Sequence, residues 1–192
     1  LPDGARLIEP FLGSGVVFLN ADYPAYVLGD RNQDLVSFYS ALRDTPDEFI
    51  EATRELFRPE TNDKTTFYEL RDRFNAETDP FQRSRLFLYL NRHGYNGLYR
   101  VNKSGRFNVP HGRYKQVKFP EEGLRILAAK LLGVALSCCD FEQTIAQAGP
   151  GDVVYCDPAY VPLSDTAWFT NYTPGGFGPD GQKRLADAAR AA

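Results

Sequence analysis

The sequence predicts an α/β fold in which a parallel sheet is interrupted by an inserted, mainly helical module. The first observation is a βαβα pattern at the start of the chain, where short apolar runs alternate with segments of helical period. The second is a return of the strand pattern after residue 133. The third is a change of composition, since residues 82–120 carry nine Lys or Arg and no Asp or Glu. This asymmetry predicts an electrostatic footprint confined to one region.

The first part of the chain alternates between strand and helix. Short apolar runs predict the strands, apolar residues three and four apart predict the helices, and Pro46 is suited to a first helical turn. In order, the expected elements are strand Arg6–Glu9, helix Val16–Asn20, strand Tyr26–Leu28, helix Asn32–Arg43 and a helix from Pro46 to about Phe57.

The rest of the chain predicts the insertion and then the return to the sheet. Two helical segments precede a stretch rich in Gly, Asn and Arg, residues 94–118, which predicts loops and a hairpin. The expected elements are helices Thr65–Glu77, Pro80–His93 and Glu121–Leu132, strands Val134–Cys138 and Asp152–Tyr155, and a final helical run Asp180–Ala192. The sheet is therefore interrupted at about residues 55–120.

Composition excludes several classes of protein. The chain has 192 residues, is 43% hydrophobic and has a net charge of −3, which indicates a globular protein. Its apolar runs are too short to span a bilayer, and no signal peptide is visible. Three cysteines and two histidines without ligand spacing predict no metal and a reducing, cytoplasmic location. The lack of methionine, the start near a strand and the stop inside a helical run predict truncation at both ends.

Glycines or acids follow each of the first three expected strands, at the edge where open α/β sheets bind ligands. The first strand runs into Glu9-Pro10-Phe11-Leu12-Gly13-Ser14-Gly15, whose glycines allow close approach of a ligand to the backbone. The carboxylate of Asp30 is suited to accept hydrogen bonds from the two hydroxyls of a ribose. The acid of Asp140-Phe141 is suited to accept one from an adenine amino group. The alternative for residues 9–15 is a plain strand-to-helix turn without a ligand. The alternative for Asp30 and Asp140 is that each is the N-cap of a helix.

The last expected strand ends in Asp157-Pro158-Ala159-Tyr160. The carboxylate of Asp157 and the carbonyl of Pro158 can each accept one hydrogen of an exocyclic amine, and Tyr160 can stack on the ring that carries the amine. The alternative is a turn that closes a buried strand. A glycine turn, a ribose acid, an adenine acid and this motif at successive strand ends together favour the functional interpretation.

These residues make the sequence similar to the DNA adenine-N6 methyltransferases of the Dam type, over nearly the whole chain. Glu9–Gly15 matches the family's Glu/Asp-Pro-Phe-x-Gly-x-Gly turn, and Asp30 matches its ribose acid. Asp157–Tyr160 matches its Asp-Pro-Pro-Tyr motif. Phe87–Tyr114 resembles its target-recognition region, a longer and more specific match.

The resemblance implies a Rossmann-like, S-adenosylmethionine-dependent methyltransferase fold with an inserted, mainly helical target-recognition domain. The implied parts are a cofactor-binding part in 1–54, the target-recognition insertion in 55–120 and the continued catalytic domain in 121–192. The implied reaction transfers a methyl group to N6 of an adenine flipped out of double-stranded DNA, within GATC or a close relative. It requires no metal, and we expect a monomer that acts on the nucleoid of a bacterial or phage-infected cell.

The motifs and the resemblance together give three sets of expected site residues. The positions that contact DNA by resemblance alone are Arg71, Leu98, Arg100, Pro110 and Tyr114. The catalytic set is Asp157, Pro158 and Tyr160. The cofactor-binding set is Glu9, Pro10, Phe11, Gly13, Gly15, Asp30, Asp140, Phe141 and Asp157. The DNA-binding set is Arg71, Tyr95, Asn96, Leu98, Arg100, Asn102, Pro110, Arg113, Tyr114 and Lys115.

The DNA-binding set has different expected roles. Tyr95-Asn96-Gly97-Leu98 is a candidate wedge between base steps, and Arg100 can make a bidentate contact to guanine. Asn96 and Asn102 are further candidate readers of base edges. The residues expected to contact phosphates are Lys103, Arg106, Arg113, Tyr114 and Lys115. For each basic residue the alternative is a solvated surface side chain.

The sequence departs from the family pattern in three places. Ala159 stands where the family motif has proline, and both the N-terminal Lys-Trp-Ala-Gly-Gly-Lys-like segment and the C-terminal strands are absent. Two alternatives therefore stay open. One is an amino methyltransferase that acts on cytosine N4, RNA or a protein glutamine amide. The other is an inactive remnant that binds DNA or cofactor.

Overall fold

The computed structural model describes residues 1–159 and 177–192. The chain divides into two compact units, of which the first comprises Leu1–Val36 with Gly133–Ala192 and the second comprises Ser37–Leu132. In the described ranges, no helix is both long enough and apolar enough to cross a membrane.

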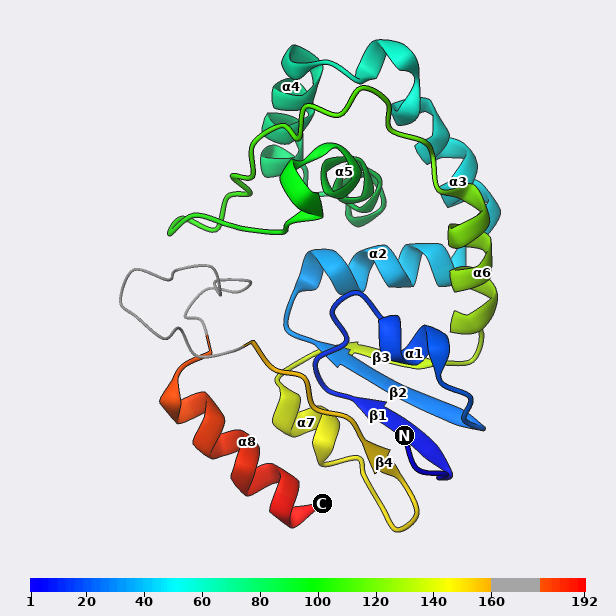
Figure 1. Ribbon diagram of the computed structural model, residues 1–192, viewed down its shortest axis with the longest axis vertical. Helices are drawn as coiled ribbons and strands as arrows, with labels where there is room; N and C mark the ends of the chain where they lie inside the picture. Colours follow the sequence, from blue (N-terminus) through cyan, green and yellow to red (C-terminus); the bar gives the residue numbers. More distant parts are fainter. Residues whose placement is uncertain (160–176) are drawn as a thin grey trace. The chain divides into compact units, whose positions relative to one another are not determined.

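The first unit contains a parallel sheet whose four described strands follow the order β3-β2-β1-β4 (Figure 1). The strands are β1 (Arg6–Glu9), β2 (Ala25–Asp30), β3 (Ala135–Cys138) and β4 (Val153–Val154). In β1, Leu7 pairs with Tyr26 of β2 on one side and with Val153 of β4 on the other. β1 is buried on both faces, since the successive residues Leu7, Ile8 and Glu9 are all buried instead of alternating with exposed ones. The predicted fold class and strands are confirmed.

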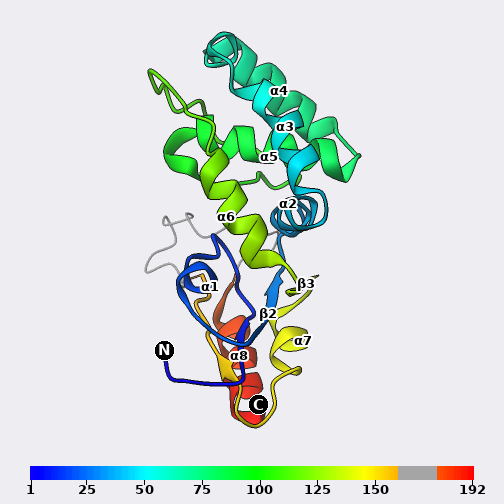
Figure 2. The ribbon, with the colours of Figure 1, turned by 90° about the vertical axis from the view of Figure 1, so that its right-hand side faces the viewer.

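Three described helices belong wholly to this unit, α1 (Val16–Asn20), α7 (Phe141–Ile145) and α8 (Pro179–Ala191). α7 packs on β1, β2 and α8, and Figure 2 shows it beside α8. Gly29 of β2 lies against Thr144 of α7, since a Cβ at Gly29 would be 2.1 Å from the Thr144 Oγ1. Only glycine allows this contact. The hydrophobic period did not predict α7, because five residues are too few to show it, and only the alternative of an N-cap at Asp140 indicated a helix there.

The second unit is mainly helical, as predicted. It contains most of α2 (Gln33–Asp44), together with α3 (Pro46–Arg54), α4 (Lys64–Ala76), α5 (Pro80–His93), α6 (Glu121–Leu131) and 3-10 turns at Glu55–Phe57, Pro59–Thr61 and Tyr95–Gly97. α5 packs against both α3 and α4, so that its residues 86–90 are all buried. The unit is wider than the expected insertion of 55–120, because α3 packs on α5 and α6 packs on α3.

The expected loops and hairpin between residues 94 and 118 are confirmed. Gly94 bridges to His111, and Val101 bridges to Phe107, both in antiparallel fashion. Phe107 and Val109 are buried, so this segment is fixed to the helices by alternate residues. The expected helix from Pro46 to about Phe57 is an α-helix only as far as Arg54 and continues as a 3-10 turn.

His93 closes α5 inside the core of the second unit. It is 1% exposed, and its ring stacks on Tyr89 with 4.0 Å between the centroids. Nδ1–H donates to the Tyr89 carbonyl at 3.0 Å, whereas Nε2 has no partner among the described residues. Burial, with smaller effects from His111 and Arg92, lowers the pKa of His93 to about 4. The folded protein therefore holds this imidazole neutral.

Acidification should destabilise the protein through His93. The folded pKa of about 4 lies below the ordinary value of 6.5, so the stabilisation is complete above pH 6.5 and is lost as the pH falls toward 4. We expect this residue to lower the free energy of unfolding by up to about 3 kcal/mol over that range. His93→Phe, which keeps an aromatic ring but cannot take up a proton, should remove this part of the pH dependence. Urea unfolding of both proteins across the range checks it, and identical pH slopes would contradict it.

Candidate functional site

The carboxyl ends of the four described strands carry the acids that the sequence singled out. Glu9 ends β1 and Asp30 ends β2, while Asp140 follows β3 and Asp157 follows β4. Because all the strands are parallel, these residues lie at one edge of the sheet, in the order Asp140, Asp30, Glu9 and Asp157. This is the edge where open α/β sheets bind ligands.

The glycine turn after β1 is tied to the end of β2 by Asp30. Gly13 and Gly15 have φ values of 49° and 68°, in the left-handed region that favours glycine. The Gly13 N–H donates to one carboxylate oxygen of Asp30 at 3.0 Å, and the Asn32 N–H donates to the other at 2.8 Å. Burial raises the pKa of Asp30, although these N–H groups oppose the shift. Asp30 therefore fixes the shape of the turn.

The cap of α2 is Asn32, and not Asp30 as one alternative had it. The Asn32 Oδ1 accepts a hydrogen bond from the Asp34 N–H at 3.1 Å, in the first turn of the helix. The backbone N–H groups of Gly13, Arg31 and Asn32 donate to Asp30, whereas an ionised carboxylate can accept about four hydrogen bonds. The carboxylate can therefore accept further hydrogen bonds from a ligand.

Glu9 is buried beside the same turn. Its side chain is 2% exposed, the backbone N–H of Phe18 is hydrogen-bonded to it, and its Oε1 has no partner among the described residues. Burial raises the pKa of Glu9 to about 7. Near neutral pH the group is therefore divided between its protonated and ionised forms, and it links the end of β1 to α1.

Asp140 and Phe141 begin α7. Asp140 caps the helix by accepting a hydrogen bond from the Glu142 N–H at 3.2 Å, which confirms the cap expected as an alternative. Phe141 is 2% exposed, and its ring stacks on Phe11 with 5.3 Å between the centroids. The Phe141 ring therefore belongs to the core, so that a ligand contact at these two positions has to come from the backbone or from Asp140.

Arg184 also lies at this edge, and the sequence reasoning missed it. From α8 its guanidinium pairs with Asp140 at 2.8 Å and Glu142 at 2.6 Å, and it lies 4.9 Å from the centroid of the Phe141 ring. It therefore ties α8 to the first turn of α7. The sequence gives only a weak signal for this role, because a basic residue in an amphipathic helix is typical of a solvated face.

Asp157 offers a carboxylate on a fixed strand end. The Tyr155 N–H donates to the Ile8 carbonyl at 2.9 Å, which keeps the chain in register with β1 close to the motif. The side chain of Asp157 is exposed and has no partner among the described residues. It is therefore available to a ligand amine, with the carbonyl of Pro158 next in the chain. Tyr160, the remaining residue of the expected catalytic set, lies outside the described residues.

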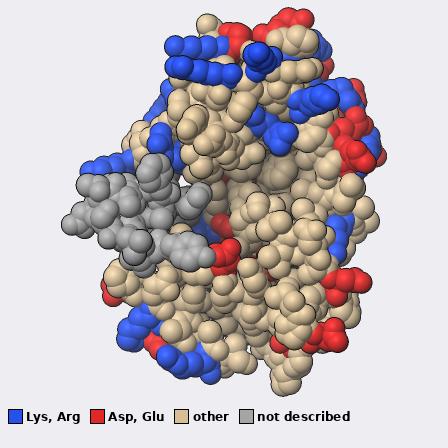
Figure 3. Space-filling view, in the orientation of Figure 1, with Lys and Arg blue, Asp and Glu red and all other residues tan. Residues whose placement is uncertain are grey.

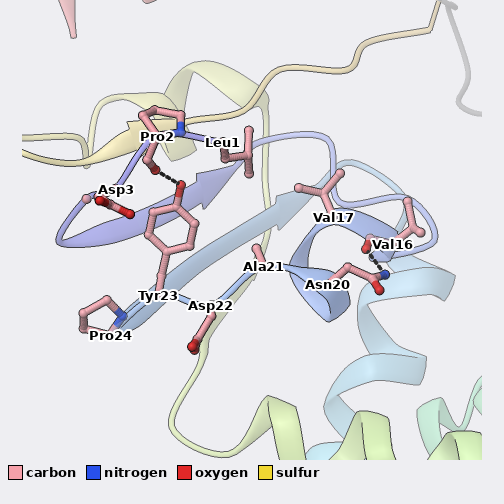
Figure 4. A pocket seen from close by; sticks show the side chains of 11 residues that line it. Leu1, Pro2, Asp3, Val16, Val17, Asn20, Ala21, Asp22, Tyr23 and Pro24 are labelled. Atoms are coloured by element: carbon pink, nitrogen blue, oxygen red, sulfur yellow. Dashed lines mark hydrogen bonds between the residues drawn. The ribbon is translucent and has the colours of Figure 1, made fainter.

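A cavity of about 750 Å³ lies at the opposite end of the strands. It is lined by residues that precede β1 and β2 and by α1, including Pro2, Val16, Asn20 and Tyr23 (Figure 4). The Tyr23 hydroxyl donates to the Pro2 carbonyl across it at 2.5 Å. Because this is the amino edge of a parallel sheet, it is not the expected ligand edge. Among the described residues, no group of three or more His, Cys, Asp or Glu could hold a metal ion.

In the second unit, Tyr95 stands at the start of a tight turn. Asn96 and Gly97 have φ values of 53° and 62°, and the Leu98 N–H donates to the Tyr95 carbonyl at 3.2 Å. Two successive left-handed residues define a turn of type I′, for which Asn-Gly is the preferred pair. The turn leaves the Tyr95 side chain 52% exposed. The conformation of the turn is therefore sufficient to account for asparagine at position 96, independently of any contact between Asn96 and a base.

The neighbouring segment holds this turn in place. The Tyr95 N–H donates to the Pro110 carbonyl at 2.9 Å, and the Asn96 N–H donates to the Tyr114 hydroxyl oxygen at 3.0 Å. Arg113 has a φ of 59°, which makes it, with Asn96, one of two described non-glycine residues in the left-handed region. Both lie in the expected DNA-binding set, and strained backbone of this kind gathers at functional sites.

Three other residues of the expected DNA-binding set differ in how far their side chains are buried or hydrogen-bonded. Arg71 of α4 is partly buried, with its guanidinium 4.5 Å from the Tyr68 ring centroid and one Nη donating to the Val109 carbonyl at 3.4 Å. Lys115 is exposed. The Asn102 Oδ1 accepts hydrogen bonds from Ser104 and from the Arg106 N–H, so it closes a turn of the chain.

The positive charge of this segment is not neutralised within the described residues. None of Lys103, Arg106, Arg113 or Lys115 forms an ion pair there. By contrast, α3 and α6 pair their charges, as in Arg125–Asp47 at 2.8 Å, and Figure 3 shows red and blue side chains close together over these helices. Unpaired basic residues around exposed aromatic and amide groups are the pattern of a nucleic-acid contact surface.

All 192 residues match the family model of the D12 class N6 adenine-specific DNA methyltransferases. The chain belongs to this family.

Curated relatives agree with the family match. The chain is 50% identical to the DNA adenine methylase of Salmonella typhi, 49% to that of Escherichia coli strain K12 and 46% to that of Vibrio cholerae. Each comparison spans 189 residues, which is 98% of this chain and 68% of the relative. The resemblance drawn from the glycine turn, the strand-end acids and the basic insertion is thus confirmed. Membership of the family implies a methyl donor and DNA as substrate.

Replacing Glu9 should change how stability depends on pH. Its folded pKa of about 7 lies above the ordinary 4.5, so its contribution is complete below pH 4.5 and is lost as the pH rises through 7. Glu9→Gln has the same shape and carries no charge at any pH. We expect the variant to be more stable than the wild type by about 2 kcal/mol at pH 8 and similar to it near pH 4.5. Urea unfolding at the two pH values checks this, and a pH-independent difference would mean that Glu9 titrates normally.

Proposed function

We propose that this chain transfers a methyl group from S-adenosylmethionine to N6 of an adenine flipped out of double-stranded DNA, within GATC. The main support is the family match together with Asp157, an exposed carboxylate without a described partner at the ligand edge of the sheet. Residues 1–54 and 121–192 would form the catalytic domain, and residues 55–120 would recognise the target. Since the substrate is duplex DNA, the enzyme would act on the nucleoid of a bacterial or phage-infected cell, and we propose that it does so as a monomer.

S-adenosylmethionine fits the donor and acceptor groups at this edge. Asp30 keeps acceptor capacity for a ribose diol, and Asp140, at the end of the neighbouring strand β3, would accept from the adenine amino group. At Gly13 an added Cβ would meet nothing nearer than 4.0 Å, so the turn leaves open space beside the backbone. The remaining expected cofactor positions, Glu9, Pro10, Phe11, Gly15 and Phe141, would support this turn and the start of α7.

The residues of the motif would orient the target amine. The cofactor supplies an electrophilic methyl group when it is bound. The amino nitrogen of adenine is a poor nucleophile, because its lone pair is delocalised into the ring. If Asp157 and the Pro158 carbonyl each accept one amino hydrogen, the nitrogen moves toward a pyramidal geometry and its lone pair is aimed. Tyr160 would stack on the flipped base.

An inactive DNA- or cofactor-binding member of the family is the second candidate, and Ala159 is the observation that favours it. The proline of the family motif would restrict the backbone of Pro158, whose carbonyl is a proposed acceptor. Alanine keeps that carbonyl and costs about 0.4–1 kcal/mol of rigidity where the native φ suits proline. This loss is modest, so we favour an active enzyme.

Methyl transfer to defined duplexes tests the proposal. The full-length wild-type protein should label a duplex that contains GATC and should not label a scrambled duplex of equal composition. Asp157→Ala should abolish labelling while leaving the thermal unfolding midpoint within a few degrees, because the exposed side chain has no described partner to lose.

The outcomes separate the candidates. Wild-type protein that binds DNA but transfers no methyl group would support the inactive member. Labelling of a scrambled duplex would overturn GATC, and substantial turnover by a well-folded Asp157→Ala variant would mean that another group orients N6.

Replacing Arg100 and replacing Lys115 should affect DNA binding in different ways. Arg100→Ala should relax discrimination at one guanine by roughly 1–3 kcal/mol, because a base-reading contact is lost. Lys115→Ala should weaken binding to all duplexes alike and reduce the salt slope by about one, because a phosphate contact is lost. Binding to duplexes with single base-pair changes, measured at several salt concentrations, checks both. Identical profiles for the two variants would refute this division of roles.

A further inference from the structure

Arg100 and Asn108 face each other across a short hairpin, residues 100–108. The Asn108 N–H donates to the Arg100 carbonyl at 3.1 Å, and the Asn102 N–H donates to the Arg106 carbonyl at 2.9 Å. Val101 and Phe107 form an antiparallel bridge between these bonds. The two ends of the hairpin are therefore held in a fixed register.

The side chain of Arg100 is held by Asn108 alone among the described residues. Its Nε–H donates to the Asn108 Oδ1 at 2.7 Å, and one Nη2–H donates to the Asn108 carbonyl oxygen at 3.2 Å. An exposed arginine normally samples many rotamers. Two hydrogen bonds from adjacent nitrogens to one residue fix both the direction of the side chain and the plane of its guanidinium.

Asn108 is itself fixed by the helical core. Its neighbours Phe107 and Val109 are 3% and 1% exposed, so Asn108 points outward between two buried residues. Asn75 of α4 clamps the backbone of Phe107, accepting its N–H at 2.7 Å and donating to its carbonyl at 3.0 Å. A continuous set of contacts thus runs from α4 through Asn108 to the guanidinium of Arg100.

The free donors of Arg100 all lie at the far end of the guanidinium. Nε and Nη2 form one fork of the group, and Asn108 occupies that fork. Three hydrogens remain, two on Nη1 and the second on Nη2. One Nη1–H and the remaining Nη2–H form the end-on fork. That fork presents two parallel donors, which is the pattern that matches the O6 and N7 acceptors of guanine.

We propose that Asn108 is a positioning residue for sequence recognition, which holds Arg100 so that its end-on fork reads one guanine. The proposal rests on the proposed function. Asn108 lies outside the sets of residues expected to touch DNA, and it acts through Arg100. Its contribution is preorganisation, because a side chain already held in its binding geometry loses less freedom when the duplex binds.

Discrimination at the Arg100 base pair tests the proposal in the full-length protein. Methyl transfer and direct binding would be measured on the GATC duplex and on duplexes with each base pair changed in turn. We expect Asn108→Ala to reduce discrimination about tenfold at the base pair affected by Arg100→Ala and to leave the other positions unchanged. Asn108→Asp keeps the acceptor for Nε and should restore discrimination, although its charge weakens binding to every duplex. Ser104→Ala, in the turn of the same hairpin, is the matched control and should keep the wild-type profile.

A double variant distinguishes positioning from direct contact. In the Arg100→Ala background, Asn108→Ala should have no further effect on discrimination, since the residue through which it acts is absent. An equal loss on all duplexes with a shallower salt slope would overturn the proposal and make Asn108 a phosphate contact. An unchanged profile, or an effect that persists without Arg100, would also overturn it.

The two proposals can fail separately. If the wild-type protein transfers no methyl group but its binding discrimination depends on Asn108 as described, the proposed activity fails and the positioning role stands. If methyl transfer is specific and Asn108→Ala matches the wild type, only the positioning role fails. A wild-type protein without any discrimination between duplexes would refute both.

Discussion

The hydrogen bonds that β1 shares with β2 on one side and β4 on the other hold together segments from opposite ends of the chain. β1 and β2 lie within the first 30 residues, whereas β4 begins at Val153. The ligand edge exists only once this non-local pairing has formed, because Asp157 reaches it through β4 and Asp30 through β2. The pairing is central and buried, so it also excludes water from the backbone of β1. Any change that displaces β4 by one residue would turn the motif to the other face of the sheet.

The second unit holds long polar side chains of its surface in defined positions. Its core is built from aromatic residues of α4 and α5, and Phe107 and Val109 join the loop segment to that core. Side-chain amides fix the conformation of the surface loops, since Asn75, Asn91 and Asn102 all form hydrogen bonds with backbone groups. An amide is suited to this task because it donates and accepts without adding charge. The surface can therefore be rigid while its net charge stays positive.

The sequence was sufficient for the sheet and for the long helices, because their hydrophobic periods are clear over many residues. It was insufficient for α7, which is too short to show a period and begins at a residue pair that also looked like a ligand site. It also misplaced the cap of α2, because Asp30 and Asn32 are both good caps and only the hydrogen bonds distinguish them. Arg184 and Asn108 were missed because they act through contacts over 44 and 8 residues of sequence. For Asn108, the sequence did contain one indication, which is a polar residue between the apolar residues Phe107 and Val109.

If Asp157 accepts a hydrogen bond from the target amine as proposed, its exposure sets a thermodynamic condition on binding. A solvated carboxylate loses hydration when a ligand closes over it, and a hydrogen bond to an amine must first offset that loss. An isolated adenine would therefore gain little from Asp157. The free energy that brings the base to the carboxylate has to come from contacts made elsewhere on the nucleic acid, which the unpaired basic residues of the second unit can supply. On this view the carboxylate contributes to the rate far more than to the affinity, and short or single-nucleotide substrates would be poor ones even though they contain every atom that reacts.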